Sequence, residues 1–598
     1  MNRTTSHRTA PAALLPQVTT IVQAAGGQLR AEFHRPGGPR GRGSKAVIDT
    51  EIEQFLKAHL LHLHPAGWRG EETPRTTAST SDTWVVDPQD GTRAFLKGLR
   101  GPAISVALLR DGMPVLGIVY APTAPDDCGD MFTWAEGAEL RRNGIAAPRM
   151  APSGYDARTV IAMNEEAADY AATNQARYVP ARVMAMPSIA YRLALVAVGE
   201  ADLGLSLTHG LDAYDIAGGH ALLIGAAKVL TDLGGSPIRY DRGMTYAGCI
   251  GGTEALIRAV QPRIGGGGNR VARNPARPAR RATSGQMLAR AQGALLGQLA
   301  GDALGSYVEF QSAREINGHH PEGVRDLRDG GHWGTIAGQP TDDSEMALAL
   351  ARSIVAQGGF QPEAAGRAYI AWKQSHPFDM GGTTSMGISA LMGRGQASTS
   401  SQSNGALMRV SPIGIANPGN PARAAEQARA DAALTHPHPV CVAASGSFTA
   451  AIAAGIAGAE AREMWAVAHA YAGEDAAGAT IRATLEAAQL GSPDDFQRQM
   501  GWVLTALQNA FHHLWAGNVL EDALVDTVGR GGDTDTNAAI CGALLGAAQG
   551  RNATPLRWRK ALATCRTLDA RGINRPRPAD YWTDDATELA EALLTCGS

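Results

Sequence analysis

Trp84-Val85-Val86-Asp87-Pro88-Gln89-Asp90-Gly91-Thr92 is a short apolar strand that runs into two carboxylates and a hydroxyl. A second stretch, Pro340-Thr341-Asp342-Asp343-Ser344-Glu345, places carboxylates and a hydroxyl before an apolar helix. Hard oxygen ligands at this density repel each other unless a divalent cation binds between them. The two stretches differ, and each has distant partners of its own, so the sequence predicts two metal-dependent domains joined end to end.

The chain of 598 residues is too long for one ordinary core, and its formal net charge of −3 is close to neutral. We therefore expect no nucleic-acid polymer as a partner. The six Cys form no C-x-x-C pair and are too sparse for a disulfide framework, which favours reduced thiols in a cytoplasmic location. Residues 1–16 lack the apolar core of a secretory signal, and no stretch approaches the roughly 18 apolar residues of a membrane span, so we expect no membrane partner.

The composition changes most sharply at residues 262–284, PRIGGGGNRVARNPARPARRATS, which contain four consecutive Gly, six Arg and no acid. Such a segment cannot bury a core. We predict domains at 1–262 and 284–598, joined by a Gly/Pro/Arg-rich linker at 263–283. A solvated tether is the favoured interpretation of the linker, and RNA binding through its Arg residues is the alternative.

Helix and strand patterns alternate before the linker, which predicts an α/β domain whose strands feed a loop-borne site. A hairpin signal at residues 110–114 separates two of the strands. The expected elements are helices within 14–64, at 189–199 and at 215–230, and strands at 84–86, 103–109 and 115–120.

Strand signals nearly vanish after the linker, which predicts an all-α domain. Gly542, Gly546 and Gly550 recur every four residues, so one face of their helix is bare backbone and permits very close helix contact. Packing must offset the cost of roughly 1 kcal/mol per Gly against Ala. The expected helices are 286–304, 344–357, 362–375, 421–434, 443–457, 475–489, 496–515 and 536–549.

The first motif brings its oxygens together through its backbone. Pro88 fixes its φ and Gly91 permits a sharp turn, so the carboxylates of Asp87 and Asp90 and the Gln89 carbonyl can face one point. The same residue types form solvated turns, which is the alternative. Two further acidic motifs favour a site: Gly70-Glu71-Glu72 and Tyr214-Asp215-Ile216-Ala217-Gly218. The second of them opens a helix, whose dipole stabilises an acid at its start.

These three motifs, in this order, resemble the inositol monophosphatase superfamily over about residues 12–262. The segment 218–240 is similar to the 3′(2′),5′-bisphosphate nucleotidase branch. The resemblance implies a layered αβαβα sandwich and Mg²⁺-dependent hydrolysis of a small phosphate monoester, such as a nucleoside bisphosphate.

The resemblance also implies roles for individual residues around two or three Mg²⁺ or Mn²⁺ ions. Thr92 would position the attacking water, and the Gly91 and Thr92 amides would hold phosphate oxygens. Glu71 would serve catalysis as well as metal binding. The implied metal ligands are Glu71, Asp87, Asp90, the Gln89 carbonyl and Asp215.

One departure concerns a further Asp that the family places ahead of its first metal-binding Glu. Asp49 matches a later, structural Asp of the family, which leaves Arg42 or Gly43 at the helper position. We therefore expect weakened activity in this domain, or Glu72 in the helper's place.

The second motif has two sequence partners. Asp342 with Glu345 fits a capping box, but a cap needs one acid and leaves Thr341 and Asp343 unexplained. The partners are Gly531-Gly532-Asp533-Thr534-Asp535-Thr536-Asn537, again before a helix, and Gly301-Asp302-Ala303-Leu304-Gly305, which leads to Val308-Glu309-Phe310.

With Ser403-Asn404-Gly405-Ala406-Leu407-Met408-Arg409 and Thr435-His436-Pro437-His438-Pro439, this set resembles the ADP-ribosylglycohydrolase family over about residues 285–598. The resemblance implies an all-α fold and a centre of two Mg²⁺ or Mn²⁺ ions. Glu309 would be an acid near the scissile ribose. The implied metal ligands are Thr341, Asp342, Asp343, Asp533, Asp535 and Thr536.

The same resemblance implies that an ADP-ribosylated target or ADP-ribose derivative is bound and hydrolysed. Either Asp343 or Glu309 would activate the water, and the sequence does not separate them. The linked group, whether Arg, Ser, nucleic acid or a small molecule, also stays open. His436 would line the pocket, with an ordinary loop histidine as the alternative. The residues that would cradle ADP-ribose are Ser403, Asn404, Gly405 and Arg409.

The prediction is therefore a multifunctional hydrolase, in which an ADP-ribosylglycohydrolase is fused to a phosphatase of the inositol monophosphatase family. Sequential action on one nucleotide is a hypothesis that rests on the fusion alone. One alternative is an ADP-ribose hydrolase whose N-terminal domain is a weakly active or non-catalytic nucleotide sensor. Another is an RNA-binding protein that acts through residues 263–283.

Overall fold

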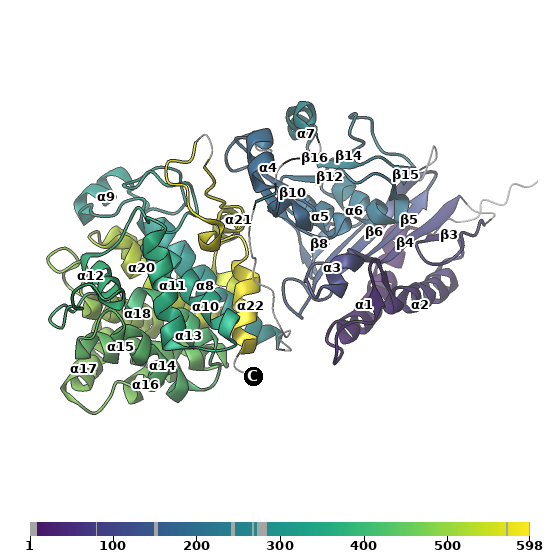
Figure 1. Ribbon diagram of the computed structural model, residues 1–598. Coiled ribbons are helices and arrows are strands. Elements are labelled where there is room, and N and C mark those ends of the chain that lie inside the picture. Colours follow the sequence, from purple (N-terminus) through teal and green to yellow (C-terminus); the bar gives the residue numbers. More distant parts are fainter. Residues whose placement is uncertain are drawn as a thin grey trace, which may run out of the picture. The chain divides into compact units, whose positions relative to one another are not determined.

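The computed structural model describes residues 9–78, 81–148, 154–240, 245–265, 268, 270–271, 284–569 and 572–596. The chain divides into two compact units, Met1–Val271 and Ala272–Ser598 (Figure 1). Most of the predicted linker, 263–283, lies outside the described residues, so its tether role stays a prediction.

The first unit contains two large sheets with helices on their faces (Figure 1). One sheet has the order β3-β4-β5-β6-β7-β8-β9 and the other β11-β10-β12-β16-β14. The strands of the first sheet are β3 Gly67–Gly70, β4 Asp82–Asp90, β5 Ala103–Arg110, β6 Met113–Ala121, β7 Asp130–Ala135, β8 Arg141–Arg142 and β9 Ile145–Ala146. Those of the second are β10 Val160–Met163, β11 Arg182–Ala185, β12 Leu203–Ser206, β14 Val229–Thr231 and β16 Cys249–Gly252.

Successive side chains along a strand enter different hydrophobic cores, which shows that each sheet has helices packed on both of its faces. In β4, Trp84 and Val86 enter the core formed with α1 and α2, whereas Val85 enters the core formed with α5 and α6. In β10, Ile161 faces the core shared with α4 and α7, and Ala162 faces α5 and α6. The layers are therefore α, β, α, β, α, which confirms the predicted sandwich. The helices are α1 Pro11–Phe33, α2 Val47–Leu63, α3 Thr92–Leu96, α4 Ala171–Tyr178, α5 Ile189–Ala197, α6 Ala213–Gly225 and α7 Glu254–Val260.

The hairpin between β5 and β6 turns at Asp111 and Gly112, which have φ values of 51° and 75°. Positive φ at both positions suits a tight hairpin turn, so the predicted hairpin is confirmed. The predicted helix at 215–230 is wrong at its end. Helix α6 stops at Gly225, and Val229–Thr231 forms strand β14, because a short apolar run fits either element.

The second unit is helical in its described regular elements, as predicted. Its strong pairing of α8 with α20 depends on small residues: a Cβ on Gly542 would overlap the Gly297 carbonyl, and one on Gly546 would overlap the Gly293 carbonyl. This confirms the close contact expected from the glycine spacing. The helices are α8 Gly285–Gly305, α9 Ala313–His319, α10 Asp342–Gln357, α11 Pro362–Gln374, α12 Gly382–Leu391, α13 Ser411–Ile415, α14 Pro421–Ala433, α15 Pro439–Ile456, α16 Ala461–Ala470, α17 Ala476–Leu490, α18 Val503–Ala516, α19 Leu520–Gly529, α20 Thr534–Gln549, α21 Leu556–Ala563 and α22 Ala586–Cys596.

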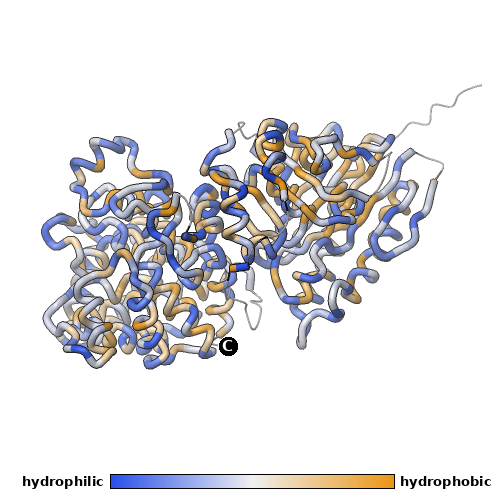
Figure 2. Tube along the Cα trace, turned by 45° about the horizontal axis from the view of Figure 1, so that its top comes forward, coloured by the Kyte–Doolittle hydropathy of each residue, from blue (hydrophilic) through white to orange (hydrophobic). Residues whose placement is uncertain are grey.

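All eight helices expected after the linker are present with shifted ends, but residues 496–502 are not helical, so α18 begins later than predicted. Figure 2 shows long hydrophobic runs along the strands of the first unit and mixed colouring along the helices of the second. This is the pattern of doubly covered strands against amphipathic helices. Among the described residues, only α15 has the length and composition of a membrane span, and it is mostly buried inside its unit, like the core helices that pass the same test.

Candidate active sites

The first site forms where β4 loses its regular pairing with β5. Asp87 pairs with Ser105 and Asp90 with Ala103, so the register shifts between the two acids. Gly91 then adopts a φ of 100° and starts α3. This irregularity turns the acidic end of the strand into a compact loop, as the Pro and Gly positions predict.

Three acids from two elements meet at this loop. One carboxylate oxygen from each of Asp87, Asp90 and Asp215 lies within 4.8 Å of the others. Asp215 comes from the first turn of α6, where its Oδ2 accepts the Asp212 N–H at 2.6 Å. Asp90 Oδ2 accepts the Ser188 hydroxyl at 2.6 Å and the Ala190 N–H at 2.8 Å, at the start of α5.

The charges at the first site are poorly compensated by the protein. Burial and the neighbouring acids raise the pKa of both Asp87 and Asp215 well above its ordinary value. The buried Gln89 side-chain atoms also have no hydrogen-bond partner among the described residues. A dense set of hard oxygen donors with raised pKa values fits a divalent cation, which would relieve the repulsion.

Glu71 joins this cluster from the other side. Although Glu71 is exposed at the surface, desolvation of its carboxylate and the charges of Asp49 and Glu72 raise its pKa to about 7, and it contacts Asp87. The loop is held by fully buried Glu53, which accepts the Glu72 N–H at 2.6 Å. No sequence motif marks Glu53; its place four residues after Asp49 on α2 is the only signal for it.

The structure changes the account of the missing helper acid. Arg42 and Gly43 are exposed in a short hairpin, whereas Asp49 is only 1% exposed. Asp49 Oδ2 caps the start of α2 by accepting the Ala46 N–H at 3.3 Å, and it lies 3.3 Å from Thr92 Oγ1. Thr92 Oγ1 also donates to the Gln89 carbonyl at 3.0 Å. Asp49 therefore caps α2, which fits the structural role expected of it, and it also reaches the Thr92 hydroxyl, which the family resemblance implies would position the water.

The second site is built around the start of α10. Asp302, near the end of α8, accepts the Thr341 N–H at 3.0 Å and the Ser344 N–H at 3.1 Å. The Thr341 hydroxyl lies 2.9 Å from Asp302 and 3.1 Å from Asp343. Asp302 therefore fixes the Thr-Asp-Asp turn through hydrogen bonds to Thr341 and Ser344. The Gly381 N–H donates to Asp342 at 3.2 Å.

Glu345 does not act as the capping acid that the local pattern allows. Its carboxylate is buried and accepts Arg577 Nε at 2.8 Å and Trp372 Nε1 at 2.8 Å. No side-chain cap bond forms at the Thr341 N-cap. The capping-box alternative is therefore wrong, because the Glu345 carboxylate binds the distant Arg577 instead of the backbone at the start of the helix.

The Gly-Gly-Asp-Thr-Asp-Thr motif supplies the other half of the second site. One oxygen from each of Glu309, Asp533 and Asp535 lies within 4.8 Å of the others. Asn404 Nδ2 donates to Asp533 at 2.7 Å, which connects the Ser-Asn-Gly segment to the same cluster. Thr536 is buried and its N–H donates to Asp535 at 2.9 Å.

This site carries the same electrostatic signature as the first. Burial and surrounding acids raise the pKa of Asp343 and Asp535 well above the ordinary range, and they raise the pKa of Asp342 to about 6. Buried Asp343 Oδ1 has no hydrogen-bond partner among the described residues. The donor set again fits divalent cations, for which Thr341, Asp342, Asp343, Asp533, Asp535 and Thr536 are available.

Arg409, expected to cradle ADP-ribose, and His436, expected to line the pocket, are both too deeply buried for direct contact with a ligand. Arg409 is fully buried in an ion pair with Asp431 at 3.0 Å, and it supports the Gly405 carbonyl at 3.3 Å. His436 is also fully buried and packs against Gly405, and burial lowers its pKa to about 3. Both residues contact Gly405 of the Ser-Asn-Gly segment, while Asn404 of the same segment donates to Asp533.

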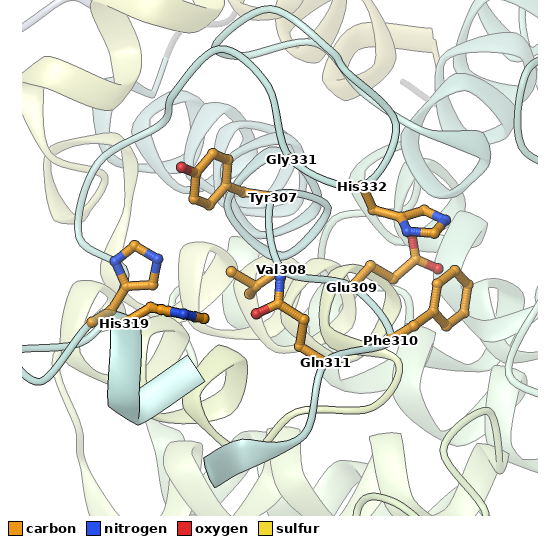
Figure 3. Close-up of a pocket in the computed structure, with 9 residues that line it drawn as sticks. Tyr307, Val308, Glu309, Phe310, Gln311, His319, Gly331 and His332 are labelled. Atoms are coloured by element: carbon orange, nitrogen blue, oxygen red, sulfur yellow. The ribbon is translucent and has the colours of Figure 1, made fainter. Parts of the chain in front are cut away.

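A cavity of about 580 Å³ opens on the Glu309 side of the second site. Figure 3 shows the Glu309 side chain directed toward His332 and Phe310, with Tyr307 and His319 across the cavity. Two neighbours of Glu309 belong to none of the motifs in the sequence. Asp379 has a pKa raised to about 10 by burial and by Asp342 and Glu309, and Trp333 Nε1 donates to Glu309 Oε2 at 2.6 Å. Both lie in loops without a periodic pattern, so no local signal marked them.

Comparisons with known proteins match the two parts of the chain to two families. Residues 283–595 match the ADP-ribosylglycohydrolase family, and residues 14–263 match the inositol monophosphatase family. The chain is 32% identical over 282 residues to the ADP-ribosyl-[dinitrogen reductase] glycohydrolase of Rhodospirillum rubrum, covering 45% of this chain and 88% of that protein. It is 29% identical over 237 residues to the probable inositol 1-monophosphatase ImpA of Mycobacterium tuberculosis, covering 38% of this chain and 86% of that protein.

Two solved structures are also similar to parts of the chain. The extragenic suppressor protein suhB from Bartonella henselae is 22% identical with a TM-score of 0.36, covering 42% of this chain and 97% of that chain. An ADP-ribosylglycohydrolase-related protein complex is 26% identical with a TM-score of 0.43, covering 52% of this chain and 99% of that chain. The similarity to the bisphosphate nucleotidase branch stays a prediction. The chain belongs to the ADP-ribosylglycohydrolase family through residues 283–595, preceded by a region that matches the inositol monophosphatase family.

Proposed function

We propose that this protein is a bifunctional metal-dependent hydrolase. The second unit would release ADP-ribose from a modified target by cleaving an N- or O-glycosidic bond. The first unit would hydrolyse a small nucleotide or sugar phosphate monoester. The observation that carries the proposal is the pair of separate carboxylate clusters, Asp87, Asp90 and Asp215 in the first unit and Glu309, Asp533 and Asp535 in the second, each with raised pKa values.

Divalent cations at these clusters would neutralise the acids, hold substrate oxygens and lower the pKa of bound water. In the second unit, we assign the acid–base role to Glu309 rather than Asp343. Glu309 lines the cavity, and burial raises its pKa to about 7, where proton transfer at neutral pH is efficient. Asp343 is fully buried within the Thr-Asp-Asp turn and suits a ligand role.

In the first unit, the Thr92 hydroxyl would orient the attacking water, with the Asp49 carboxylate beside it at 3.3 Å. Asp90 is fixed by two donors at the start of α5, so its position does not depend on the substrate. This arrangement supports catalysis in the first unit more than a purely sensory role.

The substrate of the first unit would carry a second anionic group. A cavity of about 280 Å³ is lined by Asn164, Arg177, Arg192, Ser206 and Thr208, among others. Arg192 donates to the Ser188 and Leu205 carbonyls, and its positive charge acts on Asp90. Positive charge this close to the cluster favours a nucleoside bisphosphate over an inositol monophosphate.

The test uses the whole chain and two single variants with Mg²⁺ or Mn²⁺. Phosphate release is measured from adenosine 3′,5′-bisphosphate, ADP-ribose 1″-phosphate and inositol 1-phosphate, and ADP-ribose release from arginine- and serine-linked substrates. Asp90→Asn should abolish phosphate release alone, and Asp343→Asn should abolish ADP-ribose release alone. Wild-type protein that binds a nucleotide without releasing phosphate would establish the sensor alternative. An Asp343→Asn variant with full activity would refute the assignment of the second site.

A further inference from the structure

The side chain of Glu309 receives a strong hydrogen bond from outside the acidic cluster. Trp333 Nε1 donates to Glu309 Oε2 at 2.6 Å. An indole N–H can only donate, and a bond from it to a carboxylate is charge-assisted, which makes it stronger than a neutral hydrogen bond. Trp333 lies in a short loop closed by Gly330 and Thr335, whose backbones exchange hydrogen bonds of 2.7 and 3.1 Å.

The backbone around Glu309 is fixed independently of Trp333. The Phe310 N–H donates to the Gly532 carbonyl at 3.0 Å, and the Gly532 N–H donates to the Gln311 carbonyl at 3.0 Å. These bonds tie the Glu309 segment to the residues just before Asp533. The remaining freedom of Glu309 is therefore in its side-chain torsions, and the indole N–H is the described donor that restricts them from the cavity side.

Trp333 is itself held in place by rings and by a distant part of the chain. Its ring lies 4.7 Å from His332 and 5.7 Å from Phe378, between ring centroids. Arg575 Nε donates to the Trp333 carbonyl at 2.9 Å, and Asn574 Nδ2 donates to the Gly334 carbonyl at 3.2 Å. Residues 574–575 thus fix the loop that carries the indole.

The same segment continues to the other half of the site. Arg577 donates from Nε and Nη2 to the buried carboxylate of Glu345, on the helix that begins with Asp342. Residues 574–577 therefore contact both the Trp333 loop and the Thr-Asp-Asp helix, which come from different parts of the sequence. Their contacts set the distance between the two.

We infer that Trp333 is a positioning residue that holds the Glu309 carboxylate in its orientation between the cavity and the acidic cluster, and that residues 574–577 maintain this orientation. The inference rests on the proposed glycohydrolase function. Removing the N–H would leave Glu309 free to rotate away from its working position without removing any group that binds substrate. The effect should therefore fall on turnover and leave substrate binding nearly unchanged.

The test measures kcat and KM for ADP-ribose release by the full chain carrying Trp333→Phe, which keeps an aromatic ring but has no N–H. The expected result is a kcat about 10- to 100-fold lower, as for the loss of one charge-assisted hydrogen bond, with KM within about twofold. Trp465→Phe is the matched control, because it removes an indole N–H that donates elsewhere: Trp465 Nε1 on α16 donates to the Leu485 carbonyl on α17 at 2.9 Å. It should leave both constants unchanged.

The Glu309→Gln background shows whether Trp333 acts through Glu309. In single-turnover measurements, adding Trp333→Phe to Glu309→Gln should change the residual rate by less than about twofold. A kcat of Trp333→Phe equal to wild type, or an undiminished effect in the Glu309→Gln background, would overturn the inference. If Trp333→Phe loses its helical circular dichroism, Arg575→Met decides instead: a several-fold lower kcat supports the inference, and an unchanged kcat overturns it. A wild-type chain that releases no ADP-ribose would refute the proposed function itself.

Discussion

Asp342→Asn should make the metal-free protein more stable, although it removes a predicted metal ligand. Asp342 is a buried acid of the second site. Its burial and the charges of Asp302 and Asp533 raise its pKa from 3.8 to about 6. The ionised carboxylate therefore destabilises the folded protein by about 3 kcal/mol at pH 8. The amide of Asn carries no charge and can still accept the Gly381 N–H.

The pH dependence gives the sign. A carboxylate whose folded pKa is raised destabilises the folded state fully above the folded pKa and not at all below the unfolded pKa. The advantage of Asp342→Asn should therefore be about 3 kcal/mol near pH 8 and should vanish as the pH falls from about 6 to 3.8. This value is an upper limit, because the neighbouring acids share protons with Asp342.

Added metal should reverse the order. A cation present at about 100 times its Kd stabilises the wild-type fold by about 2.7 kcal/mol, and Asp342→Asn should lose this gain. Removing a group that only orients a metal ligand lowers metal affinity or activity roughly 10- to 100-fold. Asp342→Asn removes a ligand itself, so ADP-ribose release should fall by at least that factor.

The assay is calorimetric unfolding of the full chain at pH 8 and pH 4, with chelator and with Mg²⁺ or Mn²⁺. Asp585→Asn is the matched control, because Asp585 is a buried acid that pairs with Arg352 at 2.8 Å instead of with other acids. It should destabilise the protein by about 3–5 kcal/mol with or without metal. A metal-free Asp342→Asn protein that is as unstable as Asp585→Asn, or that keeps its stabilisation by metal, would refute the reasoning.

Two further predictions concern the first site and the packing of the second unit. Asp49→Asn should lower kcat for phosphate release about 10- to 100-fold with little change in ADP-ribose release, because the carboxylate beside Thr92 is lost; equal phosphatase rates would show that Asp49 is only a cap. Gly546→Ala should destabilise the second unit by about 1–3 kcal/mol in chemical unfolding, since its Cβ would overlap the Gly293 carbonyl. Gly366→Ala, on a helix position with room for a methyl group, should instead be neutral or stabilising by up to about 1 kcal/mol.

The layers and helices of both units could be predicted because their signals are local. The continuous apolar run at 84–86 marks a strand covered on both faces, and the glycine spacing at 542–550 marks a helix that another helix approaches closely. Element ends were less accurate. The run at 226–230 continues the apolar pattern of α6, and only the sheet contact with β16 makes its end a strand.

The groups that orient the sites could not be predicted, because their partners are distant in sequence. Glu345 has the spacing of a capping acid, and its ion pair with Arg577 depends on how the C-terminal segment folds over α10. Trp333 and Asp379 stand in loops whose sequence carries no periodicity. Long-range contacts of this kind follow from tertiary packing and leave no mark within a short window of sequence.

Two acids of the first site also cap helices. Asp215 accepts an N–H at the start of α6 and lies within 4.8 Å of Asp87 and Asp90. Asp49 caps α2 with Oδ2, which also lies beside Thr92, while its buried Oδ1 has no partner among the described residues. A cap fixes one carboxylate oxygen against the backbone and so sets the direction of the other. A sequence pattern that fits a cap is therefore no argument against a catalytic site, since the cap supplies the rigidity that the site requires.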